Sequence, residues 1–337
     1  MFGKSQNIKK YFISILGLIV ILIFSVQLGY GQEYTIKFGE NWPIESSRGK
    51  TALLFKDILE RTSEGAIKVE VYPSAQLGTQ EELTDAVKMG SVEMAWVYSM
   101  TVNNKFVIYS MPFLFEDWEQ AMDTRDSPFS KRLNEECKKD GYYIVATFFD
   151  PPRNITNNVR PIEKPDDLKG LLIRVPPLDT LRKSMEALGA SPQKISYSDV
   201  YMALKTGVVD GQENPNLQIK DSKFYEVQKY LSLVRYCIYP GTLALNLDFY
   251  ESLPSKYQKL VDLAAHTAVD YFAWYVRTQM GEYEQFLREK MIVNEITPEN
   301  HKLFAEKLKP LYQEYINDGY FTQKEIDEIK TYLESRK

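Results

Sequence analysis

One helical pattern near the C-terminal end of the chain is longer than a small lobe can hold. Apolar and polar residues keep helical spacing from residue 254 to about residue 290. We therefore expect two lobes, with this helix lying across both and serving as a backbone for hinge motion. The length of 337 residues agrees, because it exceeds what one hydrophobic core comfortably holds.

Upstream of this helix, strand-length apolar segments alternate with amphipathic segments of helix length. The β-α-β-α-β order predicts a mostly parallel, open α/β sheet, followed by a second βα series. Such sheets bind ligands at the carboxyl ends of their strands. The expected strands cover residues 34–38, 67–72, 93–97, 143–149, 171–175, a segment around Val208 and Val209, and 243–247. The expected helices are one capped by Ser46 or Ser47, residues 81–88, 178–188 and 199–205, and two amphipathic helices from Pro298 onward.

No internal repeat, low-complexity tract or Gly/Ser linker separates the two series. Crossing strands are therefore expected to join the lobes, in place of a flexible tether. We expect residues 32–150 with about 240–279 to form lobe I. Residues 151–239 with about 280–337 would form lobe II and the C-terminal helices.

The N-terminal residues have the pattern of an export signal. Three lysines (Lys4, Lys9 and Lys10) precede an apolar run over residues 11–28, and Gly29 and Gly31 stand where a signal peptidase reads small residues. We expect residues 1–31 to be a signal peptide cleaved near Gly31, which leaves a mature form that is not membrane-embedded. The competing interpretation is an uncleaved anchor helix, because the run approaches the ~20 residues that span a bilayer.

The charge of the chain argues against several classes of partner. Losing residues 1–31 removes three lysines and no acid, so the net charge goes from −5 to −8. An acidic surface disfavours nucleic acid and anionic membranes. An anionic ligand would have to be attracted by a few local Arg or Lys side chains in a cleft.

Catalytic and metal-binding patterns are missing from the sequence. His266 and His301 are the only histidines, and no pair of residues has metal-ligand spacing. Cys137 and Cys237 read as two buried free thiols, although an oxidising compartment would allow a disulfide. We therefore expect a binding protein without a cofactor or metal, and not an enzyme.

Arg174 is the most informative single residue, because it ends an apolar strand. A buried guanidinium is costly unless a partner neutralises it. That partner could be an internal Asp or Glu, or it could be the carboxylate of a ligand. Residue types alone leave the two alternatives even.

The segments around Arg174 resemble the DctP-type solute-binding proteins of TRAP transporters. The similarity covers the chain from Phe38 to the C-terminal helices. It rests on six segments: Tyr72-Pro-Ser-Ala-Gln-Leu-Gly, Gly-Leu-Leu-Ile-Arg174-Val-Pro, Ala190-Ser-Pro, Tyr197-Ser-Asp-Val-Tyr, Val209-Asp-Gly-Gln-Glu-Asn-Pro and Phe224-Tyr-Glu-Val-Gln-Lys-Tyr-Leu. The resemblance implies an α/β periplasmic-binding-protein-like fold with two lobes and a long helix crossing both.

The resemblance also implies a periplasmic receptor that closes on a small organic-acid ligand and delivers it to TRAP membrane permease subunits. Arg174 would form a bidentate salt bridge with a ligand carboxylate, Asn214 would contact the same carboxylate, and Arg153 would approach the ligand. Asn41 matches a polar cleft residue of the other lobe. Aromatic candidates for the cleft walls are Trp42, Trp96, Tyr98, Tyr197, Tyr236 and Tyr239, of which Trp42 is the foremost.

The ligand is left open by these residues. A C4-dicarboxylate is the default, with Arg153 as the second cation, whereas a sugar acid or a keto or aromatic acid would use the aromatic walls. Sialic-acid binders carry an acid where Tyr98 stands, which argues against sialate. Two rival interpretations are the receptor of an ATP-driven importer and a ligand sensor for a signalling partner.

Overall fold

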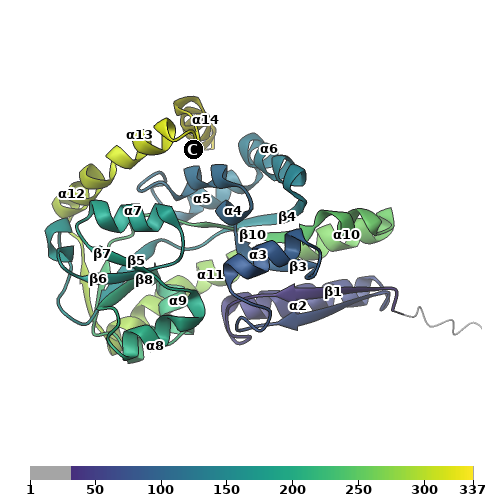
Figure 1. The fold of residues 1–337 in the computed structure, drawn as a ribbon, viewed down its shortest axis with the longest axis horizontal. Coiled ribbons are helices and arrows are strands. Elements are labelled where there is room, and N and C mark those ends of the chain that lie inside the picture. The colour runs from purple at the N-terminus through teal and green to yellow at the C-terminus, as the bar shows by residue number, and fades with distance from the viewer. Residues whose placement is uncertain (1–31, 337) are drawn as a thin grey trace, which may run out of the picture.

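The structure is a computed structural model that describes residues 32–336. The expected signal peptide over residues 1–31 therefore lies outside the described residues. Two separate β-sheets lie at the two ends of the molecule, and helices pack around each of them (Figure 1). The expected two-lobe α/β fold is confirmed.

The first sheet has five strands in the order β2-β1-β3-β10-β4. Its strands β1, β2 and β3 pair in parallel, whereas β10 runs antiparallel to both β3 and β4. The expectation of a mostly parallel sheet holds apart from β10, which is the strand that returns from the other lobe. The strands are β1 (Tyr34–Gly39), β2 (Ile67–Tyr72), β3 (Met94–Tyr98), β4 (Tyr142–Phe149) and β10 (Pro240–Asn246).

Most of the helices around the first sheet begin at a side-chain cap. The hydroxyl of Ser46 accepts a hydrogen bond from the Gly49 amide and so starts α2, as expected. Thr79 and Glu82 form a reciprocal capping box at α3. The helices are α2 (Ser47–Thr62), α3 (Gln80–Lys88), α4 (Ser99–Val102), α5 (Trp118–Asp123), α6 (Pro128–Glu136) and α10 (Leu247–Ser252). Short 3-10 helices cover Asn104–Ser110, Thr124–Asp126 and Cys137–Asp140.

The second sheet has six strands in the order β11-β9-β5-β8-β6-β7. Strand β5 runs antiparallel to β8 and β9, and the other pairs are parallel. The prediction of a strand around Val208 and Val209 is wrong: these residues form a bend, and the strand begins at Gly211. The strands are β5 (Arg153–Asn157), β6 (Leu172–Val175), β7 (Ser191–Lys194), β8 (Gly211–Pro215), β9 (Tyr230–Leu233) and β11 (Ile292–Glu295).

Helices α7 (Asp179–Ala187), α8 (Val200–Lys205) and α9 (Asn216–Asp221) pack around the second sheet. Short 3-10 helices cover Pro165–Leu168, Tyr197–Asp199 and Phe224–Glu226. Beyond residue 297 the structure has three helices where two were expected. A turn at Lys309, followed by Pro310, separates the first two of them. These helices are α12 (Pro298–Leu308), α13 (Pro310–Asn317) and α14 (Gln323–Glu334).

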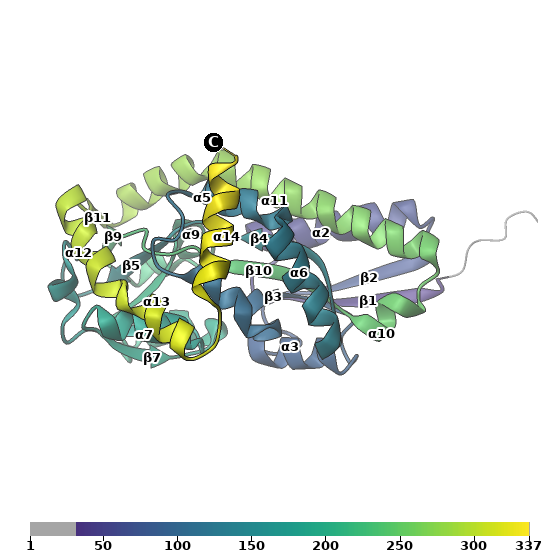
Figure 2. The same ribbon diagram turned by 90° about the horizontal axis from the view of Figure 1, so that it is seen from above.

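The expected long helix is α11 (Ser255–Lys290), and it lies across both lobes (Figure 2). Its first part packs against α2 and β4 of the first lobe, and its last part packs against α9 and β11 of the second. Small buried residues such as Ala264, Ala265 and Ala268 let it lie close to its neighbours. Among residues 32–336, no helix combines the length and the apolarity needed to cross a membrane.

Two extended segments connect the sheets, as the absence of a linker indicated. One joins β4 to β5 and the other joins β9 to β10. They run side by side, because the amide of Asp150 donates to the Tyr239 carbonyl and the amide of Arg153 donates to the Cys237 carbonyl. Rotation of one lobe against the other would bend these two segments and α11.

Candidate functional site

Arg174 lies near the end of β6 and is only 1% exposed. Its Nε donates to the backbone carbonyl of Ile195 at 2.8 Å, which fixes the direction of the side chain. Its Nη1 and Nη2 have no hydrogen-bond partner among the described residues. Burial lowers the pKa of Arg174 to about 10, so the group still carries its charge at neutral pH. The structure therefore shows no internal carboxylate partner for Arg174 among the described residues, although the sequence left that alternative open.

Arg153 lies fully buried in β5 and does have an internal partner. Its Nε donates to Oε2 of Glu213 at 2.5 Å, and its Nη2 donates to Oε1 of the same carboxylate at 2.9 Å. The Tyr236 hydroxyl donates to Oε2 of Glu213 as well, at 2.8 Å. The charge of Arg153 is therefore balanced within the protein, and only its Nη1 has no partner.

A third buried arginine, Arg48, enters the site from the start of α2. Its Nη2 donates to both carboxylate oxygens of Asp150, at 2.5 and 2.6 Å. Its guanidinium carbon lies 3.6 Å from the ring centroid of Trp42, a cation–π geometry. Nε of Arg48 has no partner.

Aromatic rings connect the arginines across the two lobes. The rings of Trp42 and Tyr197 meet with centroids 5.5 Å apart, and Tyr197 lies 5.9 Å from the guanidinium carbon of Arg174. Tyr98 makes an edge contact with Tyr239 at 5.9 Å. Burial raises the pKa of Tyr98. The positive charges of Arg153, Arg48 and Arg174 partly oppose that rise, so the Tyr98 hydroxyl lies in the electrostatic field of all three guanidiniums.

The two asparagines lie on opposite sides of the site. Asn214, in β8, accepts from Arg153 Nη2 at 3.0 Å and donates to Gln212 Oε1 at 2.5 Å. Asn41 donates to the Gly78 carbonyl at 2.8 Å, and its Oδ1 is buried without a partner. Asn214 is thus placed to hold Arg153, whereas Asn41 has a free acceptor.

Many buried polar atoms without a partner occur in the segments that form the site. Leaving such an atom unpaired costs about 1–3 kcal/mol. A ligand that supplied the missing hydrogen bonds would remove this cost. The atoms are Glu40 Oε1 and Oε2, Asn41 Oδ1, Trp42 Nε1, Arg48 Nε, Trp96 Nε1, Ser99 Oγ, Arg153 Nη1, Arg174 Nη1 and Nη2, and Gln218 Oε1.

Glu40 follows the last residue of β1 and is fully buried. Burial raises the pKa of its carboxyl to about 8, and the positive charge of Arg48 opposes that rise only in part. Its backbone is fixed, because its amide donates to the Tyr72 carbonyl and its carbonyl accepts from the Ala75 amide. The side chain nevertheless has no partner.

Contacts between the lobes close over these residues. Besides the Trp42–Tyr197 ring contact, the amide of Ser47 in α2 donates to Oδ2 of Asp221 in α9 at 3.2 Å. Arg48, Arg153 and Arg174 are each at most 2% exposed. The described structure is therefore a closed arrangement of the two lobes.

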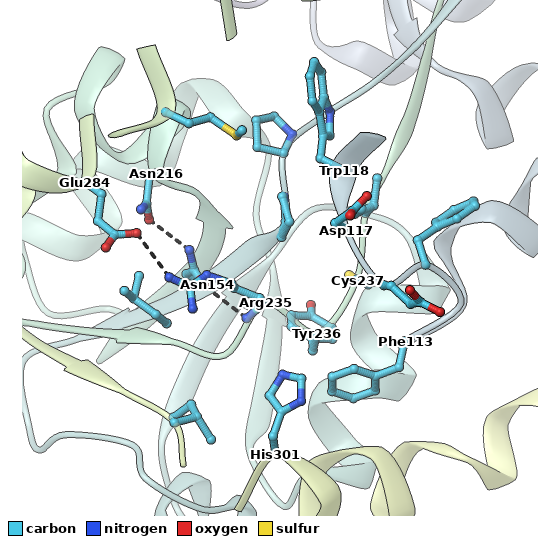
Figure 3. Close-up of a pocket in the computed structure, with 18 of the residues that line it drawn as sticks. Phe113, Asp117, Trp118, Asn154, Asn216, Arg235, Tyr236, Cys237, Glu284 and His301 are labelled. Atoms are coloured by element: carbon cyan, nitrogen blue, oxygen red, sulfur yellow. Dashed lines mark hydrogen bonds and ion pairs between the residues drawn. The ribbon is translucent and has the colours of Figure 1, made fainter. Parts of the chain in front are cut away.

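A cavity of about 1060 Å³ lies on the α11 side of the crossing segments, and Arg48, Arg153 and Arg174 are not among its lining residues. Figure 3 shows Trp118, Arg235, Glu284 and His301 around it, with Tyr236 and Cys237 among the lining residues. The Arg235 guanidinium pairs with Glu284 at 3.1 Å. Tyr236, expected in the ligand cleft, thus has its ring beside this cavity and its hydroxyl on Glu213.

Sequence reasoning missed Glu40, Arg48 and Asp150. Glu40 and Asp150 each follow the last residue of a strand, so the rule that ligands bind at strand ends could have indicated both. Arg48 begins a helix among Ser, Gly, Lys and Thr, where nothing in the pattern signals burial. Trp96, expected as a possible wall, packs within the core between Phe38 and Phe148.

Neither a metal cluster nor a disulfide is present among residues 32–336. No group of three or more His, Cys, Asp or Glu side chains in that range could hold a metal ion. Cys137 and Cys237 are free and buried, as the sequence suggested. His301 contacts the Val234 carbonyl and the Phe113 ring, and neither group belongs to Arg48, Arg153 or Arg174.

Comparison with known proteins agrees with this geometry. Residues 38–318 match the family described as bacterial extracellular solute-binding protein, family 7. The chain is 30% identical over 286 residues to the C4-dicarboxylate-binding periplasmic protein DctP of Rhodobacter capsulatus, which covers 83% of this chain and 85% of the relative. It is 29% identical over 301 residues to the sialic acid-binding periplasmic protein SiaP of Vibrio cholerae, with 88% and 93% covered.

A solved structure shows the same fold. The sugar acid binding protein DctPAm of Advenella mimigardefordensis, in complex with galactonate, superposes with a TM-score of 0.85 at 26% identity and covers 90% of this chain and 98% of its own. The family and these relatives are solute-binding receptors and not enzymes. The chain belongs to the bacterial extracellular solute-binding proteins of family 7, the DctP-type receptors of TRAP transporters.

Proposed function

We propose that this receptor captures a small organic-acid anion by one carboxylate, which forms a bidentate salt bridge with Arg174. The observation that carries the proposal is the unpaired end of Arg174: Nη1 and Nη2 are buried without a partner, whereas Arg48 and Arg153 each have an internal carboxylate. A guanidinium presents two parallel donors that match the two oxygens of a carboxylate.

The same unpaired atoms give a reason why a ligand would favour closure of the two lobes. Without a ligand, the closed arrangement buries the charge of Arg174 and several polar atoms of Asn41, Trp42 and Arg48 without partners. That cost opposes closure. A ligand that pairs with both lobes removes the cost only in the closed state, so its differential affinity shifts the population toward closure.

The relatives bind different acids: a C4-dicarboxylate, sialic acid and galactonate. The contact common to all three ligands would be the one between a ligand carboxylate and Arg174. Arg153 and Asn214 would lie behind Arg174. Asn41, Trp42, Tyr98 and Tyr197 would meet the remainder of the ligand. Residues 32–150 with about 240–279, and 151–239 with about 280–337, would be the two lobes that move.

Export and delivery complete the proposal. Lys4, Lys9 and Lys10, with the apolar run that follows, would direct the chain to the periplasm, with cleavage near Gly31. There the closed receptor would dock on TRAP permease subunits and release the acid to them. A tag placed at the C-terminus, followed by N-terminal sequencing of periplasmic protein, should give a first residue of Gln32.

A thermal-shift screen of organic acids tests the carboxylate site. Specific ligands should raise the melting temperature, because they bind the folded chain and not the unfolded one. The Arg174→Ala variant should lose the shift for the same acids. A matched control is Arg61→Ala, which removes a largely exposed guanidinium that pairs with Asp57 on α2. An equal shift in Arg174→Ala and wild type would reject the proposal.

A further inference from the structure

The cavity of about 1060 Å³ beside α11 is separate from the three buried arginines. Arg153 and Asn154 are neighbours in β5, and side chains alternate between the two faces of a strand. Arg153 pairs with Glu213 within the candidate site, whereas Asn154 lines the cavity. The cavity therefore lies on the other face of β5, behind the crossing segments, and we call it the hinge cavity.

Both lobes contribute walls to the hinge cavity. Residues 113–118 come from lobe I, and Asn216 and Ile296 come from lobe II. Residues 151–152 and 236–238 of the two crossing segments lie between these walls, and α11 closes the remaining side (Figure 3). The volume is close to the upper end of the roughly 300–1,000 Å³ of pockets that hold small molecules.

The walls leave apolar surface in contact with water. Phe113, Phe115, Met280 and Ile296 line the cavity, and each is only partly buried against the core. Removing such surface from water is favourable in proportion to its area. An apolar occupant would therefore gain free energy from these four side chains.

The aromatic side chains of the wall use their polar ends elsewhere. Trp118 Nε1 donates to the Phe149 carbonyl at 2.9 Å, and the Tyr236 hydroxyl donates to Glu213 at 2.8 Å. In the part of the chain that the structure describes, no side chain lining the cavity has a buried polar atom without a partner. This is the reverse of the candidate site, so an occupant of the hinge cavity need not supply hydrogen bonds.

The charges on the α11 wall balance one another. The Arg235 guanidinium pairs with Glu284 at 3.1 Å and with Glu295 at 3.0 Å. Arg288 pairs with the same two carboxylates. The other charged residues that line the cavity, Glu116, Asp117 and Lys302, are exposed and keep their contact with water. An uncharged occupant suits these walls, because a charged one would lose its hydration without finding an unbalanced charge on α11.

Gly281 is an independent indication of an occupant. It lies within α11, where glycine destabilises a helix relative to alanine. A Cβ at this position would have no atom within 4 Å, so packing within the protein does not require the glycine. Gly281 lines the hinge cavity, and glycine suits positions where the backbone must be approached closely by a ligand.

We propose that the hinge cavity is a second binding site, which takes a small, uncharged and largely apolar molecule, and that its occupation favours the closed arrangement of the lobes. The described structure is closed, and rotation about the crossing segments would change the distance between the lobe I wall and the lobe II wall. A molecule that contacts both walls binds one arrangement better than the others and shifts the population toward it. Because binding linkage is reciprocal, such a molecule and the organic acid should each raise the affinity for the other. This link to the acid rests on the proposed carboxylate site at Arg174.

The uncharged aromatic dye N-phenyl-1-naphthylamine is a suitable probe, because its fluorescence rises in apolar surroundings. Titration of the wild-type protein should show saturable binding at one site per chain. Wild-type protein without saturable binding overturns the proposal.

Two variants of α11 locate the probe. Gly281→Trp fills the cavity with a ring and Met280→Glu places a charge on its apolar wall, so each should weaken probe binding about tenfold or more. The matched controls Thr278→Trp and Gln279→Glu make the same changes at neighbouring residues of α11 that do not line the cavity, and they should bind the probe as wild type does. Undiminished affinity in Gly281→Trp or Met280→Glu, with folding checked by a cooperative thermal transition, overturns the proposal.

The acid identified by the thermal-shift screen tests the link to closure. At saturation it should raise the affinity for the probe about fivefold or more. An acid that displaces the probe would place the dye in the cleft, and it would overturn the proposal. An acid that leaves the probe affinity of wild-type protein unchanged overturns the link to closure.

The two proposals fail in different ways. If Arg174→Ala binds every acid as tightly as wild type does, the carboxylate site is wrong, and the α11 variants still decide on the hinge cavity. If the probe ignores the α11 variants while Arg174→Ala abolishes acid binding, the carboxylate site stands and the hinge cavity falls.

Discussion

The carboxylate of Glu213 holds Arg153 in a closed, fully buried ion pair, with Nε to Oε2 at 2.5 Å and Nη2 to Oε1 at 2.9 Å. A structural arginine and a proposed ligand-binding arginine thus lie in the same sheet, Arg153 in β5 and Arg174 in β6. The strand β8 that carries Glu213 pairs with both. The difference between the arginines is the presence of an internal acid, and it leads to opposite expectations for mutations.

Glu213→Gln should destabilise the fold, because it leaves the Arg153 charge buried without compensation. Removing one partner of a buried pair costs about 3–5 kcal/mol. Urea denaturation followed by circular dichroism measures the loss, and Glu251→Gln, at an exposed acid, provides the control. A Glu213→Gln protein as stable as the control would show that Arg153 does not need this partner.

The free energy of unfolding should depend on pH through Glu40. Its pKa is about 8 in the folded protein against 4.5 ordinarily, so between these values the folded state binds more protons than the unfolded state. The free energy of unfolding should therefore fall as the pH rises from about 4.5 to about 8, by at most about 1.4 kcal/mol per pH unit. Arg48, paired with Asp150, is the charged group that acts on Glu40.

Glu40→Gln should flatten that pH dependence, because it removes the titrating group. Denaturation midpoints of wild type and variant, measured at a series of pH values, give the comparison. Parallel curves for the two proteins would contradict the assignment to Glu40.

Gly211→Ala should destabilise the second sheet. A Cβ at this position would lie 2.1 Å from the Thr156 carbonyl oxygen, a backbone atom that cannot move aside as a side chain can. Steric overpacking of this kind costs about 1–3 kcal/mol. Gly319→Ala is the comparison without steric crowding, since no atom lies within 4 Å of a Cβ at that position. Its φ of +76° adds backbone strain of a different kind. Equal melting temperatures of Gly211→Ala and wild type would contradict the close approach of β8 to β5.

Both thiols should be unreactive in the folded protein. Burial raises the pKa of the Cys137 thiol to about 12 and raises that of Cys237 as well, so almost no thiolate forms at neutral pH. A thiol-specific colorimetric reagent should label neither residue until denaturant is added. Rapid labelling at pH 7 would show that one of the two sites opens.

Periodicity predicted the fold well where side chains alternate or repeat. Residues 34–38 and 67–72 alternate between faces and form β1 and β2, and the pattern of α11 indicated a helix across two lobes. The error at Val208 and Val209 arose because two β-branched residues stand in a bend. The strand that follows, Gly211–Pro215, is buried but mostly polar, so hydrophobicity does not signal it.

The candidate site was predictable only in part, for a related reason. Arg174 stood out because it is a charge inside an apolar strand. Glu40, Arg48 and Asp150 are polar residues in a loop, at a helix start and in a crossing segment. Their burial results from tertiary contacts between the sheet, α2 and the crossing segments, and no local pattern encodes such contacts.

The most direct measurement is the affinity of wild type, Arg174→Ala and Arg174→Lys for one acid identified in the screen. Truncating a desolvated, charge-assisted pair costs on the order of 2–5 kcal/mol, so calorimetry should show Arg174→Ala binding at least about tenfold more weakly. Arg174→Lys should recover little of that loss, because an ammonium cannot make the two parallel hydrogen bonds. Binding by Arg174→Ala as tight as that of wild type would contradict the role of Arg174 as the carboxylate-binding group.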